Sequence, residues 1–166
     1  SDIVFFTDCA QVYRARLSDF DCVKASVMGD YLPTKLEMDP GEKPILMLAS
    51  PECDFPEGDH MVFIFENGRG VRVPVSVYQT KSNRRKLTGA YSTASPIVAA
   101  FYEHKDRPFD IMTVTDADRA IIIKSSLIAQ KTTRTSNGNL VINLKKGQKV
   151  VSAISNPTEV FGDLKG

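Results

Sequence analysis

Apolar and polar residues alternate with a period of two along most of the chain, in short stretches rich in β-branched and aromatic residues. The clearest stretches are residues 4–7, 12–17, 61–65, 71–77, 111–115, 121–124, 140–144 and 149–154. Turn residues such as Asn67-Gly68 and Asn137-Gly138 separate them, and no long window shows a helical period. Because a period of two is typical of half-buried strands, the sequence predicts an all-β protein of short strands.

Three segments of the chain repeat one another. Residues 4–20, 62–78 and 112–128 each contain an apolar strand, an acidic turn, a second apolar strand, a basic residue, a serine and a large apolar residue. The equivalent positions Thr7, Phe65 and Thr115 lie 58 and 50 residues apart. Self-similarity at a spacing of about 50 residues is typical of repeat proteins.

A second strand-rich segment follows each hairpin, at residues 35–49, 94–102 and 140–154. Three glycines lie between the two parts of the repeat, at similar distances from the equivalent positions: Gly29, Gly89 and Gly138. In the first and third repeats a glycine turn splits the later segment. Each repeat is therefore predicted to be a hairpin, a polar loop, and then a second hairpin or strand pair.

One four-stranded module cannot bury both of its faces, whereas modules stacked face to face form a continuous core. The predicted fold is a propeller-like array of about three four-stranded blades, as an open or partial disc. The first blade comprises residues 1–59, the second 60–110 and the third 111–155, with a terminal tail at 156–166. A single closed barrel or sandwich with similar hairpins is the alternative.

The composition agrees with a folded domain. The chain of 166 residues is 42% hydrophobic and 25% charged, with a net charge of +1, so it can bury a core. A membrane-spanning helix needs about 20 consecutive apolar residues, and no apolar run here approaches that length. No signal peptide is evident, and the chain opens almost directly on a strand pattern, which suggests a fragment of a longer polypeptide.

The small net charge hides an asymmetry between the repeats. Residues 1–59 carry a net charge of −7, whereas residues 60–110 and 111–166 carry +4 each. The basic residues gather in the loops after the second and third hairpins, interleaved with serine and threonine, which suits contacts with phosphate groups. The candidate DNA contacts are Arg69, Arg72, Lys81, Arg84, Arg85, Lys86, Lys124, Lys131, Arg134, Lys145, Lys146 and Lys149.

The sequence offers no catalytic constellation. The two histidines, His60 and His104, have no nucleophile or carboxylate at a catalytic spacing, and Asp116-Ala117-Asp118 lies where a hairpin turn is expected. The three cysteines form no C-x-x-C pair, which argues against a zinc site and for a reducing, cytoplasmic setting. We therefore expect no catalytic residue, no metal site and no cofactor in this chain.

Two segments carry a resemblance to a known family. Residues 62–78 and 136–154 follow the order strand, turn, strand, basic residue, serine, aromatic, then strand, glycine turn and strand. This pattern resembles the C-terminal domain of the A subunits of bacterial type IIA topoisomerases, DNA gyrase and topoisomerase IV. The resemblance covers nearly all of residues 3–155. It implies a β-pinwheel, whose blades exchange strands with their neighbours and whose basic rim binds and wraps double-stranded DNA.

The resemblance also implies a parent enzyme, located in the cytoplasm with the nucleoid. That parent would be an ATP- and Mg²⁺-dependent topoisomerase that forms an A2B2 complex with an ATPase B subunit, and its catalytic residues would lie outside this chain. The chain departs from gyrase because it lacks a string close to Q-R-R-G-G-R-G on its first blade. This departure favours DNA bending over strong chiral wrapping. A blade module that binds proteins and no nucleic acid is the alternative.

Overall fold

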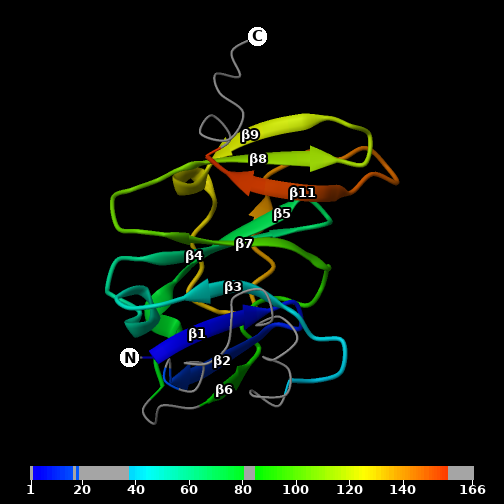
Figure 1. Cartoon of the computed structure of the whole chain (residues 1–166). Helices are drawn as coiled ribbons and strands as arrows, with labels where there is room; N and C mark the ends of the chain where they lie inside the picture. Colours follow the sequence, from blue (N-terminus) through cyan, green and yellow to red (C-terminus); the bar gives the residue numbers. More distant parts are fainter. Residues whose placement is uncertain (1, 17, 19–37, 81–84, 157–166) are drawn as a thin grey trace. The chain divides into compact units, whose positions relative to one another are not determined.

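The computed structural model describes residues 2–16, 18, 38–80 and 85–156. These residues form short antiparallel strands and turns of 3-10 helix, and none of them lies in an α-helix. The strands make three sheets, each open at both ends (Figure 1). The prediction of an all-β fold with three blades is therefore confirmed, and no sheet closes on itself as a barrel would. No helix among the described residues is long and apolar enough to cross a membrane.

The first sheet has the strand order β3-β1-β2-β6. Its strands are β1 (Asp2–Thr7), β2 (Gln11–Arg16), β3 (Pro44–Leu48) and β6 (Lys86–Thr88). The turn of 3-10 helix η2 (Glu52–Asp54) follows β3. The predicted strands at 4–7 and 12–17 correspond to the hairpin of β1 and β2.

The second and third sheets have the orders β10-β5-β4-β7 and β11-β8-β9. The second contains β4 (His60–Phe65), β5 (Arg69–Pro74), β7 (Ile97–Glu103) and β10 (Asn139–Leu140). The third contains β8 (Asp110–Thr115), β9 (Ala120–Lys124) and β11 (Val150–Ser155). The turns of 3-10 helix η3 (Val75–Tyr78) and η4 (Ser125–Leu127) follow β5 and β9.

The three hairpins are equivalent in detail. Thr7, Phe65 and Thr115 each end the first strand of a hairpin. At each of them the register shifts where that strand pairs with the neighbour outside the hairpin, namely β1 with β3, β4 with β7 and β8 with β11. Three residues further on, each hairpin turn holds a residue with a left-handed backbone, namely Ala10, Gly68 and Asp118. The sequence alignment of the three hairpins is therefore confirmed.

Two strands pair outside the repeat in which they lie. β6 follows the second hairpin along the chain but pairs with β2 of the first sheet. In the same way β10 follows the third hairpin but pairs with β5 of the second sheet. Each of these sheets is thus completed by a short strand from the following repeat, which we call the donated strand.

This exchange corrects two details of the sequence prediction. Residues 140–154 do not form a hairpin, because β10 joins the second sheet while β11 joins the third. Thr88 pairs with Gln11 and Leu140 pairs with Arg69, at equivalent positions of their hairpins, so Thr88 is equivalent to Leu140. Gly89 follows the first of these residues and Gly138 precedes the second, so the two glycines are not equivalent. Gly138 has a different constraint: a Cβ there would lie 2.1 Å from the carbonyl oxygen of Gly70. Gly29 lies outside the described residues.

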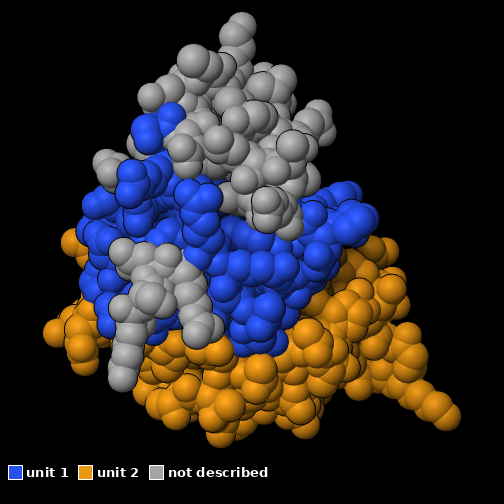
Figure 2. Space-filling model, turned by 90° about the horizontal axis from the view of Figure 1, so that it is seen from below, with its two compact units in different colours: residues 1–56, 78–91 blue, residues 57–77, 92–166 orange. Residues whose placement is uncertain are grey.

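The chain divides into two compact units, which Figure 2 shows in different colours. The first unit comprises Ser1–Pro56 and Tyr78–Tyr91, and it contains the first sheet with its donated strand. The second unit comprises Glu57–Val77 and Ser92–Gly166, and it contains the other two sheets. The border between the units passes through the second repeat because β6 is donated to the first sheet.

The core of the second unit lies between its two sheets. Val62 and Ile64 from the second sheet pack with Ile111 from the third, and Ile142 and Val150 belong to the same buried cluster. All five are at most 2% exposed. Face-to-face packing of neighbouring blades, which the sequence predicted, is therefore present in this unit.

The core of the first unit includes a buried polar network. The carboxylate of Glu42 accepts hydrogen bonds from the hydroxyl groups of Thr7 and Tyr13 and from the backbone N–H of Asp39. Elsewhere in this unit the hydroxyl of Tyr91 donates to the carbonyl oxygen of Thr7. Burial, together with the hydrogen bond to Glu42, raises the pKa of Tyr13 above its ordinary value, and burial raises that of Tyr91.

These two tyrosines predict a loss of stability at high pH. An unfolded tyrosine loses its proton above a pH of about 10, whereas the raised pKa keeps the folded one protonated. The free energy of unfolding should thus be unaffected below that pH and fall by up to about 1.4 kcal/mol per pH unit per tyrosine above it. Urea unfolding at several alkaline pH values measures this slope. Tyr91→Phe should make the slope shallower, and an unchanged slope would contradict the assignment.

Candidate nucleic-acid interface

The two basic loops occupy the same position in their repeats. Each follows the turn of 3-10 helix after a hairpin, η3 or η4, and leads into a donated strand, β6 or β10. Each loop therefore ends beside the outer edge of the preceding sheet, next to β2 or β5. Two candidates in the first of these loops, Lys81 and Arg84, lie outside the described residues.

In the first unit, Arg85 and Lys86 lie beside the basic end of β2. The backbone N–H of Arg14 donates to the carbonyl oxygen of Arg85 at 2.9 Å, and Lys86 pairs with Tyr13. The Lys86 ammonium lies 5.6 Å from the centroid of the Tyr13 ring, within range of a cation–π interaction. Arg85, Lys86 and Arg16 are all exposed, and we call them the first basic edge.

Arg14 and Arg16 were missed as candidates because they belong to the acidic repeat. The guanidinium of Arg14 forms an ion pair with Asp2 at 3.0 Å and donates to the carbonyl oxygen of Cys53 at 2.6 Å. Arg16, in contrast, is exposed at the end of β2. The alternation of Arg14 and Arg16 along β2 is the sequence signal that could have found this edge. The acidic repeat thus gains a basic edge through the donated strand.

In the second unit, the basic loop follows β5. The start of this loop lies along β5: the backbone N–H of Arg72 donates to Ala129 O at 3.1 Å, and its carbonyl oxygen accepts from Lys131 N–H at 2.9 Å. The guanidinium of Arg69 donates to Gly138 O at 2.9 Å, and that of Arg134 to Val77 O at 3.1 Å. Arg69, Lys131 and Arg134 form what we call the second basic edge.

The side chain of Arg72 has a different environment from the other candidates. Its Nε and Nη2 atoms both lie 2.7 Å from Oε1 of Glu103, whose side chain is only 3% exposed. The other carboxylate oxygen accepts a hydrogen bond from Ser125 Oγ. Nδ1 of His60 lies 3.8 Å from Glu103 and has no hydrogen-bond partner among the described residues. Arg72 therefore balances a buried carboxylate.

Three candidate lysines lie at the turn between β10 and β11. Lys145, Lys146 and Lys149 are exposed, and the backbone N–H of Lys149 donates to Asp116 Oδ1 at 3.1 Å. Arg119 is a further exposed cation of the same unit, and its guanidinium donates at 3.3 Å to the carbonyl oxygen of Asn143, which lies between β10 and this turn. Sequence reasoning did not select Arg119, which lies in a hairpin turn.

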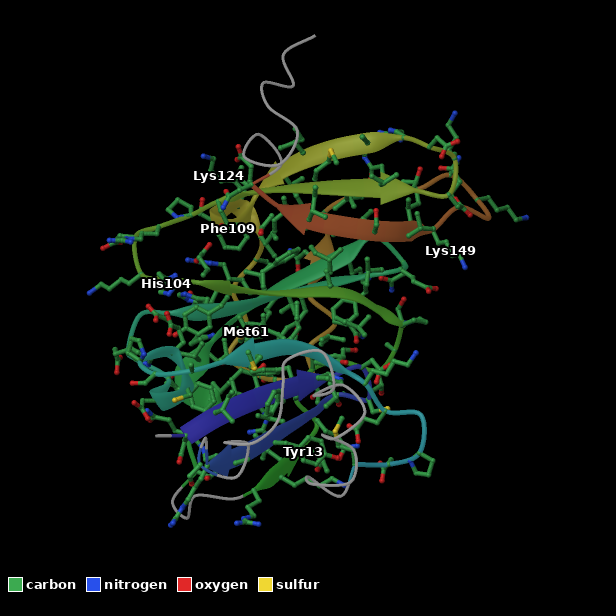
Figure 3. All side chains as sticks on the ribbon, in the orientation of Figure 1. Tyr13, Met61, His104, Phe109, Lys124 and Lys149 are labelled. Atoms are coloured by element: carbon green, nitrogen blue, oxygen red, sulfur yellow. The ribbon has the colours of Figure 1, made fainter. Side chains whose placement is uncertain are left out.

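The candidates of the second unit do not form one cluster. Lys124 ends β9 and lies 3.8 Å from Asp110, whereas Lys149 precedes β11 at the other end of the third sheet (Figure 3). Lys124 and the lysines of the turn therefore face different surroundings. Because the two basic loops hold equivalent positions in adjacent repeats, the sequence also predicts that Arg85 and Lys86 form one stripe with Lys131 and Arg134. These residues belong to different units, so the stripe stays a prediction.

The two cysteine thiols that the structure describes are not activated as nucleophiles. Burial and the neighbouring carboxylate of Asp8 raise the pKa of Cys9, and burial raises that of Cys53. Both thiols are therefore protonated at neutral pH and are poor nucleophiles. No group of three or more His, Cys, Asp or Glu side chains in the described part of the chain could hold a metal ion.

The arrangement is that of a β-blade array whose blades exchange strands. A family model described as "DNA gyrase C-terminal domain, beta-propeller" matches residues 1–26 and 110–157. Among solved structures, the C-terminal domain of DNA topoisomerase IV matches with a TM-score of 0.74 and 20% identity over 93% of this chain. The resemblance to these C-terminal domains, inferred from the repeats, is confirmed, and so is the β-pinwheel fold.

Two further solved structures have the same fold at lower similarity. The DNA gyrase A C-terminal domain matches with a TM-score of 0.58 and 13% identity, and the E. coli ParC C-terminal domain with 0.60 and 14%, each over 93% of this chain. The chain spans 46%, 47% and 61% of the topoisomerase IV, gyrase A and ParC structures. No curated protein sequence matches the chain.

Proposed function

We propose that this chain binds and bends duplex DNA without sequence specificity, as part of the C-terminal domain of a type IIA topoisomerase A subunit. The observation that carries the proposal is the repeated position of the two basic loops. Each loop brings cations to the outer edge of a sheet, at Arg85 and Lys86 in one unit and at Lys131 in the other. Exposed cations repeated at equivalent edges suit the regularly spaced phosphates of a DNA backbone.

The chemistry of these edges favours phosphate contacts over base contacts. Arginine and lysine supply charge, and the interleaved hydroxyl groups of Thr132, Thr133 and Thr135 supply hydrogen bonds to phosphate oxygens. Bending a duplex of about 20–30 base pairs costs about 1–6 kcal/mol. Neutralisation of phosphates by the basic edges would offset this cost, so binding and bending are proposed to occur together.

In this proposal the chain supports a reaction that is carried out elsewhere. The parent would pass DNA strands with ATP and Mg²⁺ bound outside this chain, pair with an ATPase B subunit in an A2B2 complex, and act on the nucleoid in the cytoplasm. The chain itself would have no catalytic role and no cofactor. Because it lacks the gyrase string Q-R-R-G-G-R-G, we propose bending in preference to strong chiral wrapping.

A gel-shift titration with duplex DNA at low salt tests the proposal. The wild-type chain should bind duplexes of unrelated sequence with similar affinity. The triple variant Arg85→Ala/Lys86→Ala/Lys131→Ala should bind about tenfold or more weakly, because each lost phosphate contact removes counterion release. All three side chains are exposed, so the folded state should tolerate their truncation.

Arg107→Ala is the matched control, since Arg107 is an exposed cation outside both basic edges. Its affinity for duplex should stay close to that of the wild type. Absence of duplex binding at low salt would end the proposal, and so would equal binding by the triple variant. Capture of a protein partner that survives nuclease treatment would then favour the protein-binding alternative.

A further inference from the structure

Glu103 is a buried carboxylate, and its partners lead to the basic loop of the second unit. It ends β7 and is 2% exposed. Its carboxylate accepts hydrogen bonds from Nε of Arg72, 2.7 Å away, and from the hydroxyl of Ser125. Nδ1 of His60 lies 3.8 Å from it. Because a buried charge is costly unless it is paired and hydrogen-bonded, this carboxylate holds its partners in place.

Ser125 connects this carboxylate to the turn that precedes the loop. It begins η4 and is 0% exposed. Its backbone N–H donates to Phe109 O at 2.8 Å, and its hydroxyl accepts the N–H of Phe109 at 3.0 Å. The carbonyl oxygen of Ser125 accepts from Ile128 N–H at 3.1 Å, which closes the turn. Ser125 is thus bonded through both its side chain and its backbone, so the chain enters the loop from a fixed point.

Arg72 and His60 hold the next residues of the loop. The backbone of Arg72 forms a bridge with Gln130, and its carbonyl oxygen accepts from Lys131 N–H at 2.9 Å. Oε1 of Gln130 lies 2.8 Å from Nε2 of His60. The side chains of Arg72 and His60 both lie within 3.8 Å of Glu103. The backbone position of Lys131 therefore depends on residues that this carboxylate holds.

The first sheet contains a similar combination. Arg14 holds the place of Arg72, since each lies seven residues after the end of the first strand of its hairpin. Its guanidinium forms an ion pair with Asp2 at 3.0 Å, and its backbone N–H donates to Arg85 O at 2.9 Å. In both sheets an arginine paired with a carboxylate thus binds a basic loop through its backbone. The Asp2 side chain is 34% exposed and that of Glu103 only 3%, so water and salt screen the second pair less.

We propose that Glu103 is a positioning residue for the second basic edge, which acts through Arg72 and Ser125 to set where Lys131 contacts DNA. The inference rests on the proposed function, because it concerns the phosphate contacts of that edge. Lys131 is exposed, and its backbone N–H is bonded to Arg72 O. A cation on a fixed backbone loses less conformational freedom when it binds, which improves affinity without any new contact.

Glu103→Gln separates position from charge, because the two predict effects of opposite sign. Removal of a negative charge by itself strengthens the binding of a polyanion, whereas a loosened loop weakens it. We expect Glu103→Gln to bind duplex DNA about three- to tenfold more weakly than the wild type at the same salt concentration. Glu57→Gln is the matched control, since it removes the same charge from an exposed position of the same unit. Its affinity should equal or slightly exceed that of the wild type.

A double-variant cycle shows whether the loss passes through Lys131. In a Lys131→Ala background Glu103→Gln should weaken duplex binding no further, because the cation that it positions is gone. In an Arg85→Ala/Lys86→Ala background it should keep its full effect, since these two residues belong to the first basic edge. Equal losses in all backgrounds would overturn the proposal, and so would an unchanged or higher affinity of Glu103→Gln.

Hydrogen exchange without DNA measures the position of the loop directly. In Glu103→Gln the amide of Lys131 should accelerate at least about tenfold more than the amide of Val150. Val150 N–H is bonded to Glu66 O at 2.9 Å in the same unit, so it reports general loss of stability. Equal acceleration at the two amides, or no change at Lys131, would overturn the role of Glu103. Should Glu103→Gln fail to fold, Ser125→Ala removes one donor to the same carboxylate and gives the same readouts.

The two measurements keep this proposal distinct from the DNA-binding proposal. If the wild type binds no duplex, the proposed function fails, and the role of Glu103 in DNA contact fails with it, whatever the exchange at Lys131. If the wild type binds duplex but the cycle or the exchange gives the opposite result, only the role of Glu103 is overturned.

Discussion

Duplex binding is expected to weaken about a thousandfold when the salt concentration is raised from about 50 to about 200 mM. The expectation assumes that about six phosphates are neutralised, each of which lowers the affinity by about 0.9 log units per log unit of salt. The described chain offers enough exposed cations for this number, namely Arg69, Arg85, Lys86, Lys131, Lys145, Lys146 and Lys149. A series of binding isotherms at increasing salt gives the slope.

The slope also separates the groups of candidates. If the turn between β10 and β11 contacts DNA, Lys145→Ala/Lys146→Ala should lower the salt slope by the contribution of about two phosphates. If only the basic edges contact DNA, the slope should stay unchanged. Lys124→Ala should have less effect, because Lys124 lies 3.8 Å from Asp110. An affinity that does not change with salt would contradict a phosphate-based interface altogether.

Glu103→Ala is expected to lower the free energy of unfolding by about 3 kcal/mol or more. Glu103 is 2% exposed, and its carboxylate accepts hydrogen bonds from Arg72 and Ser125. Its removal leaves the guanidinium of Arg72 and the hydroxyl of Ser125 without their acceptor, next to Nδ1 of His60, which has no hydrogen-bond partner among the described residues. Denaturation in urea, followed by circular dichroism, measures the loss.

A second variant separates lost charge balance from a simple cavity. Replacing both members of the pair, as in Glu103→Leu/Arg72→Leu, removes the uncompensated guanidinium and should cost less than Glu103→Ala alone. Glu57→Ala is the surface control, since Glu57 is exposed and its truncation should stay within about 0.5 kcal/mol. A double variant less stable than Glu103→Ala would show that the ion pair itself stabilises the unit.

The repeated hairpins could be predicted from the sequence because each is a local pattern. Strands of five or six residues with a turn between them carry enough alternation to be recognised, and Thr7, Phe65 and Thr115 fixed the alignment. The donated strands could not be predicted, because β6 has three residues and β10 has two. Strands this short have no measurable period, and their pairing is decided by partners distant in sequence.

The candidate site could also be predicted only where its signal is local in the sequence. Loop composition was sufficient to select Lys131, Lys145 and Lys146, which are exposed. It could not reveal that Arg72 balances Glu103, because these residues are 31 positions apart and meet only when β4 lies between β5 and β7. It also placed Arg85 and Lys86 in the second blade, whereas they extend the edge of the first sheet.

The donated strand has a consequence for how such a chain can be shortened. A truncation at residue 59 looks natural in the sequence, but it would remove β6 and strip the first sheet of the partner of β2. The first unit needs Tyr78–Tyr91 as well as Ser1–Pro56. A repeat can therefore be deleted or duplicated without breaking a sheet only if each hairpin is kept together with the donated strand that follows it in the next repeat. The sequence segment that can be copied or removed as a unit is thus shifted along the chain relative to the segment that repeats in the sequence.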